Sequence, residues 1–266
     1  MDRFTRWLQA YPSQTKNTKE VMLQLQRFFG PQCKPDHMYT DNAGELVKAA
    51  EKLGWLHDTS TPWRSETNGV IERAVRIVKE GVSCALVQSG FNSQWWAEAM
   101  MCFCFLKNVH DLLDGDETSF KRRYGANFYG PIIPFGCHIS YKPITPQDIA
   151  RLPQFGSNNL EGIFVGYSQQ AGGGWDGDLL IVDWHELEEA EFQYEVKVKR
   201  FKEQEVTVLK FGDKFRFPLA ECALKQPGGT EKSRVRRRKR RKAPAESGEN
   251  VEDENENRID RLPIIR

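Results

Sequence analysis

Two acidic residues, Asp41 and Glu72, stand at positions from which a protein can hold a hard metal ion. Asp41 directly follows a short apolar segment that predicts a buried strand, and ligands of open α/β sheets collect at the carboxyl ends of strands. Glu72 lies one turn into a predicted long helix, and Arg76 and Lys79 follow four and seven residues later on the same helical face. A carboxylate beside two cations suits a divalent metal ion bound next to a phosphate backbone.

The same residues also have simpler explanations. Glu72 and Arg76 are four residues apart, which is the spacing of an ordinary surface salt bridge on a helix. Asp41 stands just before a predicted helix, so its side chain is also able to cap that helix. The spacing alone leaves these alternatives open.

The elements around these residues alternate short apolar runs with helical patterns. Strands are predicted over residues 4–10, 37–40 and 55–57, and helices over residues 15–29 and 43–53. A third helix begins at Gly69, with a buried stripe expected at Val70, Ala74, Ile77, Gly81 and Cys84. A fourth, over residues 94–109, is apolar on nearly every face and should pack against much of the domain. This alternation favours an α/β layer.

The second half of the chain has a different pattern, with short segments rich in β-forming residues. Strands are predicted over residues 137–141, 162–167, 179–184, 192–198, 205–211 and 214–217. Glycines 172–174 and the Asp176-Gly177 pair predict turns, and the whole predicts a small barrel or sandwich. Aromatic side chains here are compatible with a base-stacking surface, although small barrels more commonly bury them; they are Trp175, Trp184, Phe192 and Tyr194.

Charge is unevenly distributed over the 266 residues, which sum to +1. Residues 1–230 hold 26 Lys and Arg against 29 Asp and Glu, whereas nine basic residues lie within 232–242. The core of that run consists of Arg236, Arg237, Arg238, Lys239, Arg240, Arg241 and Lys242. It predicts a nuclear import signal, a nucleic-acid arm or both, or else a solvated segment without a partner. Six acidic residues within 246–256 are able to fold back on it.

Several classes of protein are excluded by composition. The longest nearly apolar stretch, residues 95–106, is too short for a membrane span, and the first residues are charged where a signal peptide is apolar. The six cysteines lack a metal-binding spacing and predict reduced, mostly buried thiols. We therefore expect an intracellular protein, in the nucleus or the cytoplasm, without a metal ion held by sulfur.

Short motifs follow one another along the chain: DRFTRW at 2–7, TDNAGE at 40–45, STPW at 60–63, NGVIER at 68–73, PFGC at 134–137 and EGIFVGY at 161–167. The first four resemble the integrase core of copia-type and related retrotransposons. The last two resemble the SH3-like β module that follows that core in copia-type polyproteins.

This resemblance implies an RNase H-like fold and a three-carboxylate site that binds two Mg²⁺ or Mn²⁺ ions for an in-line phosphoryl exchange. By motif match, Asp41 is the second catalytic carboxylate and Glu72 the third, so both are implied metal ligands. The expected DNA contacts are Asn68, Arg76 and Lys79. DNA is the implied partner, and members of the family act as multimers.

Two departures from the family pattern affect the expected activity. Thirty residues separate Asp41 from Glu72, fewer than is customary, which is consistent with a shortened surface loop. The first carboxylate of the family lies on a strand upstream of the D-x-F-[ST]-R segment, where this sequence starts, and Asp2 is that segment's own aspartate. The implied central strand also lies upstream, so a strand over 4–10 would lack its neighbour. We interpret the chain as a fragment of a longer polyprotein that binds metal weakly and does not perform strand transfer alone.

The sequence thus predicts an α/β fold class: a partial RNase H-like integrase core, a small all-β SH3-like module and a disordered charged tail. These parts are expected over residues 1–110, 131–222 and 223–266, with a connector over 111–130. The predicted function is DNA integration by metal-dependent phosphoryl transfer, with nucleic-acid binding, in a fragment that lacks one catalytic carboxylate. The alternative is a non-catalytic DNA-binding or interaction protein derived from such an element. A homo-oligomer and a nuclear import receptor are possible further partners.

Overall fold

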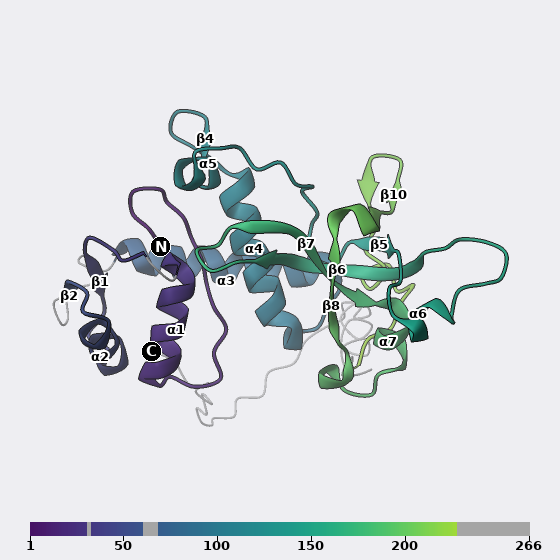
Figure 1. Ribbon diagram of the computed structural model, residues 1–266, viewed down its shortest axis with the longest axis horizontal. Coiled ribbons are helices and arrows are strands. Elements are labelled where there is room, and N and C mark those ends of the chain that lie inside the picture. Colours follow the sequence, from purple (N-terminus) through teal and green to yellow (C-terminus); the bar gives the residue numbers. More distant parts are fainter. Residues whose placement is uncertain (31–32, 61–68, 228–266) are drawn as a thin grey trace, which may run out of the picture. The chain divides into compact units, whose positions relative to one another are not determined.

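Two helices and two short strands alternate in the first 60 residues of the computed structural model, which describes residues 1–30, 33–60 and 69–227 (Figure 1). They are α1 (Thr18–Phe29), β1 (Met38–Thr40), α2 (Gly44–Leu53) and β2 (His57–Thr59). The side chain of Asn17 caps α1, and Gly54 ends α2 in the left-handed conformation. β1 and β2 pair in parallel, with Met38 opposite His57. This βαβ arrangement confirms the predicted α/β fold class.

Two long helices follow and pack against each other. They are α3 (Gly69–Ser89) and α4 (Trp96–His110), joined through the 3₁₀ turn η2 (Ser93–Trp95). Ala74 and Val78 form the buried side of α3, and Gly81 allows the Phe103 ring to approach closely. The predicted stripe is wrong at Val70 and Cys84, which are exposed. A small hairpin, β3 (Leu112–Leu113) and β4 (Glu117–Thr118), then leads to α5 (Ser119–Tyr124).

The second half of the described chain forms a five-stranded antiparallel sheet in the order β8-β7-β6-β5-β9. Its strands are β5 (His138–Tyr141), β6 (Leu160–Gln169), β7 (Trp175–Asp183), β8 (Val198–Lys202) and β9 (Val206–Val208). Between and after them lie α6 (Pro146–Ile149), α7 (Trp184–Glu189), η3 (Gln193–Glu195), η4 (Glu203–Glu205) and the hairpin β10 (Lys210–Phe211) and β11 (Lys214–Phe215). A sheet of this size and order fits an SH3-like module.

One hydrophobic core extends from Trp7 to Leu224 and includes both the sheet and α4. The Phe105 ring of α4 lies 4.5 Å from the Tyr167 ring of β6, and Cys102 is buried in the same cluster. Burial on so many sides explains why α4 is apolar almost all round, as predicted. The sheet is therefore covered by a helix from the first half of the chain.

The strand predicted over residues 4–10 is wrong. Asp2 accepts hydrogen bonds from the Phe4 backbone and the Thr5 hydroxyl, and Arg6 adopts a positive φ of 62°, which bends the chain. Beyond the bend, the buried Asn108 side chain accepts from the Leu8 N–H at 2.9 Å and donates to its carbonyl at 2.6 Å. A side-chain amide thus supplies the backbone bonds that a neighbouring strand would otherwise supply.

The other differences from prediction concern boundaries and one missed strand. β2 begins two residues after the predicted start at 55, and residues 192–198 form η3 and a loop rather than a strand. β8 was not predicted as a separate strand. The Asp176-Gly177 pair lies inside β7, at an irregularity in its pairing with β6, whereas glycines 172–174 do form the turn.

The start of the predicted tail is folded. Leu224 is buried, and the Gln226 side chain accepts from the Asn92 N–H and donates to the Gly90 carbonyl. Residues 223–227 therefore pack beside the end of α3, and the rest of the predicted disordered tail lies outside the described residues.

Three of the cysteines, Cys102, Cys104 and Cys137, are buried as expected, but Cys33, Cys84 and Cys222 are exposed. Among the described residues, no helix combines the length and the apolar character that crossing a bilayer requires.

Candidate catalytic and nucleic-acid-binding site

Asp41 lies immediately after β1, at the carboxyl end of the parallel pair, and its side chain is exposed. The two strands are joined there by the Ser60 N–H, which donates to the Thr40 carbonyl at 2.8 Å. The Thr40 hydroxyl also lies 2.8 Å from His57 Nε2, a contact that no motif predicted. Because Ala43 is the N-cap of α2 and no side chain caps it, the helix-capping explanation of Asp41 is wrong.

Glu72 lies in the first turn of α3, where it is exposed together with Arg76 and Lys79. Within the described residues, none of these three side chains forms a hydrogen bond or an ion pair, so the predicted salt bridge between Glu72 and Arg76 is not present. The face of α3 therefore presents one carboxylate and two cations to solvent. Side chains without intramolecular partners are free to contact a ligand.

The convergence of Asp41 and Glu72 on one metal ion stays a prediction. In the part of the chain described here, no hydrogen bond or ion pair joins α3 to β1 or β2. Carboxylates are the ligands that Mg²⁺ and Mn²⁺ prefer. The described ranges, however, contain no group of three or more His, Cys, Asp or Glu side chains that is able to hold a metal ion. The donor type fits, but the three-carboxylate set that the resemblance implies is not assembled from these residues.

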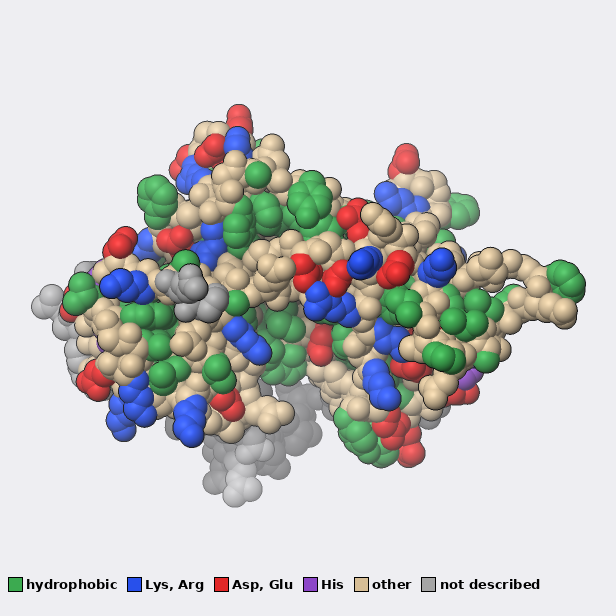
Figure 2. All heavy atoms as spheres, viewed as in Figure 1, with side chains coloured by type: hydrophobic (Ala, Val, Ile, Leu, Met, Phe, Trp, Pro, Cys, Tyr) green, Lys and Arg blue, Asp and Glu red, His purple; other side chains and the backbone are tan. Residues whose placement is uncertain are grey.

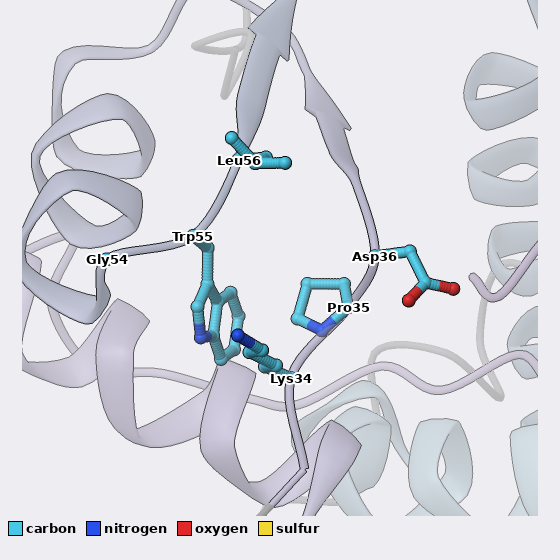
Figure 3. Close-up of a pocket in the computed structure, with 6 residues that line it drawn as sticks. All are labelled: Lys34, Pro35, Asp36, Gly54, Trp55 and Leu56. Atoms are coloured by element: carbon cyan, nitrogen blue, oxygen red, sulfur yellow. The ribbon is translucent and has the colours of Figure 1, made fainter.

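A cavity of about 230 Å³ lies at the opposite end of the strand pair from Asp41. It is formed by the residues that precede β1 and β2, namely Lys34, Pro35, Asp36, Gly54, Trp55 and Leu56. Trp55 and Pro35 face each other across it, and the Asp36 carboxylate points away (Figure 3). The hollow and the predicted site are therefore at different edges of the two-stranded sheet.

The most densely bonded charged groups lie in the five-stranded sheet. Asp183 is completely buried, accepts two hydrogen bonds of 3.1 Å from Arg151, and accepts another from the Tyr141 hydroxyl. Burial acts to raise the pKa of Asp183, but these bonds outweigh it and hold the pKa below its ordinary value. Asp148 binds both Arg151 and Lys199. Since these groups satisfy one another, the network fastens α6 and α7 to the sheet and is not a candidate site.

Two parts of the predicted site lie outside the described residues. These are Asn68 and the basic run of Arg236, Arg237, Arg238, Lys239, Arg240, Arg241 and Lys242. Of the predicted DNA contacts, only Arg76 and Lys79 are described, and both are exposed as a phosphate contact requires.

The aromatic side chains of the second half divide into two groups. Trp175 is buried and Trp184 is partly buried in the core, as is usual in a small barrel. Phe192 and Tyr194 are exposed and stacked on each other.

No family model matches the chain, and no curated protein matches it. Among solved structures, it is similar to a chain of the simian T-cell lymphotropic virus intasome in complex with the PP2A regulatory subunit B56 gamma, with 16% identity and a TM-score of 0.40 over 79% of this chain and 70% of that one. It is also similar to the catalytic core domain of BIV integrase, with 20% identity and a TM-score of 0.31 over 41% of this chain and 72% of that one. At these TM-scores the likenesses do not carry an assignment, which has to come from the chain's own residues.

Proposed function

We propose that this chain is the integrase core and SH3-like module of a copia-type retrotransposon polyprotein, and that it binds DNA. The observation that carries the proposal is the position of the motif residues. Asp41 follows the first strand of a parallel βαβ unit, and Glu72 lies exposed in the first turn of a 21-residue helix. The order of the motifs and a five-stranded antiparallel sheet after the core further support it.

In this proposal α3 contacts the DNA backbone. Arg76 and Lys79 project from one exposed face and have no intramolecular partner among the described residues, so both are available to phosphate oxygens. Glu72 on the same face would repel phosphate unless a cation stood between them, which is the arrangement that metal-dependent phosphoryl transfer uses. With two of the three implied carboxylates, the 266 residues are expected to bind DNA and not to join it.

DNA binding by the full chain tests the proposal. The affinity for a labelled duplex, measured by fluorescence anisotropy, should fall steeply between about 50 and 200 mM salt, because bound phosphates release counterions. R76Q/K79Q should bind more weakly and lower the salt slope by about 2, one for each lost phosphate contact. The matched control K19Q/R27Q removes two exposed charges from α1 and should change neither. Equal effects of the two double variants would contradict a specific role for α3.

Metal binding tests whether Asp41 and Glu72 share one ion. Isothermal titration of the full chain with Mn²⁺ is compared among D41N, E72Q and the double variant. If one ion is shared, each single variant loses as much binding as the double variant; two separate sites give additive losses. Additive losses would contradict the shared site.

The non-catalytic alternative is tested by incubating the full chain with donor DNA ends and Mn²⁺. We expect DNA binding without joined product. A joined product that E72Q abolishes would show that the chain is itself an active integrase.

A further inference from the structure

An exposed pair of stacked aromatic rings lies in the segment after α7. The ring centroids of Phe192 and Tyr194 are 5.3 Å apart with planes 10° from parallel, and the residues are 48% and 81% exposed. Stacking them on each other covers only one face of each ring. The pair therefore presents a wide aromatic surface that the fold itself does not use.

The backbone around the pair is held in place. The Glu195 carboxylate accepts hydrogen bonds from the Glu191 and Phe192 N–H groups at 2.9 and 3.2 Å. The Gln193 side chain donates to the carbonyl of Gln94 in η2 at 3.1 Å. On either side Leu187 and Val196 are buried. The rings thus stand on an anchored turn, so a partner would meet a surface that is already formed.

The charge around the rings is negative. Glu188, Glu189 and Glu191 are exposed, and residues 184–196 contain five glutamates and no lysine or arginine. Figure 2 shows acidic and hydrophobic side chains gathered side by side over the segment that follows α7. This charge opposes a nucleic-acid phosphate backbone and attracts cations. Arginine fits both features, because its guanidinium stacks on aromatic rings and pairs with carboxylates.

We propose that this acidic aromatic patch, comprising Glu188, Glu189, Glu191, Phe192 and Tyr194, binds the arginine-rich run 232–242 of a second copy of the chain. The charges are complementary, since the run carries nine basic residues in eleven. No other segment of the sequence is comparably rich in arginine. The contact links copies without DNA, and it goes beyond the proposed function.

Self-association of the full chain after nuclease treatment tests the proposal. Sedimentation velocity at low salt should show association that rises with concentration and that about 0.5 M NaCl suppresses, as expected for exposed charges. F192S/Y194S should weaken association at least tenfold. The matched control F155S removes an aromatic side chain that is 87% exposed elsewhere and should associate like the wild type. Unchanged melting temperatures verify that the exposed positions tolerate substitution.

A second measurement identifies the occupant. A labelled peptide of residues 232–242 is titrated into a full chain whose arginines 236, 237, 238, 240 and 241 are changed to glutamine. We expect the peptide to bind and F192S/Y194S in that background to lose it. Association that persists in F192S/Y194S, association that nuclease abolishes, or a monomer at all concentrations would each overturn the proposal.

Discussion

Asp183 shows how a single buried charge depends on one partner. Its carboxylate has no exposure to solvent and receives paired hydrogen bonds from Arg151, which is only partly buried. R151A should lower the free energy of unfolding by about 3 kcal/mol, because the loss of one partner leaves a buried charge uncompensated. That value is the low end of the usual range, since Tyr141 and the Glu186 N–H still bind the carboxylate. Urea denaturation provides the measurement.

Arg200 offers a matched comparison, because it also pairs with two carboxylates of the sheet, those of Asp176 and Asp178. Its side chain is largely exposed, so water replaces the lost contacts. R200A should leave the urea midpoint nearly unchanged. Equal losses in R151A and R200A would show that burial of Asp183 is not the cause.

His138 links stability to pH. Burial lowers its pKa below the ordinary value, although Glu161, whose Oε2 lies 3.4 Å from Nε2, opposes the shift; Arg216 and Glu221 also face the ring. The unfolded chain therefore takes up this proton more readily than the folded one. The contribution is complete above about pH 6.5 and is lost as the pH falls toward the folded pKa. Stability should decline from pH 7.5 to 5.5, with a His138 contribution of at most about 1.4 kcal/mol per pH unit.

H138F should remove this part of the pH dependence. Neither ring nitrogen of His138 forms a hydrogen bond, and the ring packs 5.1 Å from Trp184, so phenylalanine fits the site chemically. E161Q should preserve the dependence, because it removes the group that opposes the shift. A wild-type slope that survives in H138F would assign the titration to another residue.

At the scale of elements, the turn between β6 and β7 is locked against the N-terminal segment. The Arg123 side chain donates to the carbonyls of Gly172 and Phe28 and lies over the Trp7 ring, so it joins α5, α1 and the turn. Gly173 approaches the same ring so closely that a Cβ on it would lie 2.6 Å from Trp7 Cζ2. The packing of this turn therefore depends on the absence of a side chain.

Gly173 and Gly177 form a matched pair for testing that packing. Their φ angles are 90° and 89°, but a Cβ on Gly177 would meet nothing within 4 Å. G177A should cost about 1 kcal/mol of backbone strain. G173A should cost about 1–3 kcal/mol more, because the methyl group overpacks the site. Thermal denaturation measures both, and similar costs would mean that Trp7 moves aside freely.

The elements that the sequence predicts well are those whose local signals agree with their burial. Helix α2 has an apolar face and a terminal glycine, and both are used. The strand predicted over 4–10 failed because Asn108, a hundred residues away, binds Leu8, and no local pattern encodes such a partner. β8 was missed because only Phe201 is buried in a strand of lysines and arginine, so it lacks the alternation of a half-buried strand.

At the scale of the whole molecule, protection should be uneven. The five-stranded sheet and α4 share the main core, whereas β1 and β2 are three residues each and form a sheet of their own. Isolated two-stranded sheets are marginal in water. The aromatic contact of this βαβ unit with the core passes through Phe29 of α1, whose ring lies 5.2 Å from that of Trp55.

Hydrogen exchange read by mass spectrometry should therefore show β6 and β7 amides exchanging through global unfolding and β1 and β2 amides through local opening. Denaturant should accelerate the first group and leave the second nearly unaffected at low concentration. Equal protection would show that the βαβ unit is part of the same cooperative unit.

The candidate site was predictable only in part. The motifs place Asp41 at a strand end and Glu72 on an exposed helical face, and both placements are confirmed. Their convergence depends on how α3 meets the strand pair, which is a long-range property that spacing does not encode. The exposure of Phe192 and Tyr194 was not predictable either, because composition does not distinguish aromatic residues of a barrel core from those of a surface turn.

The packing of Phe105 against Tyr167 has a consequence for how the two halves can be inherited. A β module with its own interior can be moved between genes by recombination as an independent cassette. Here the sheet would leave behind the helix that keeps its inner face dry, so a viable chimera has to carry α4 along or evolve a substitute for it.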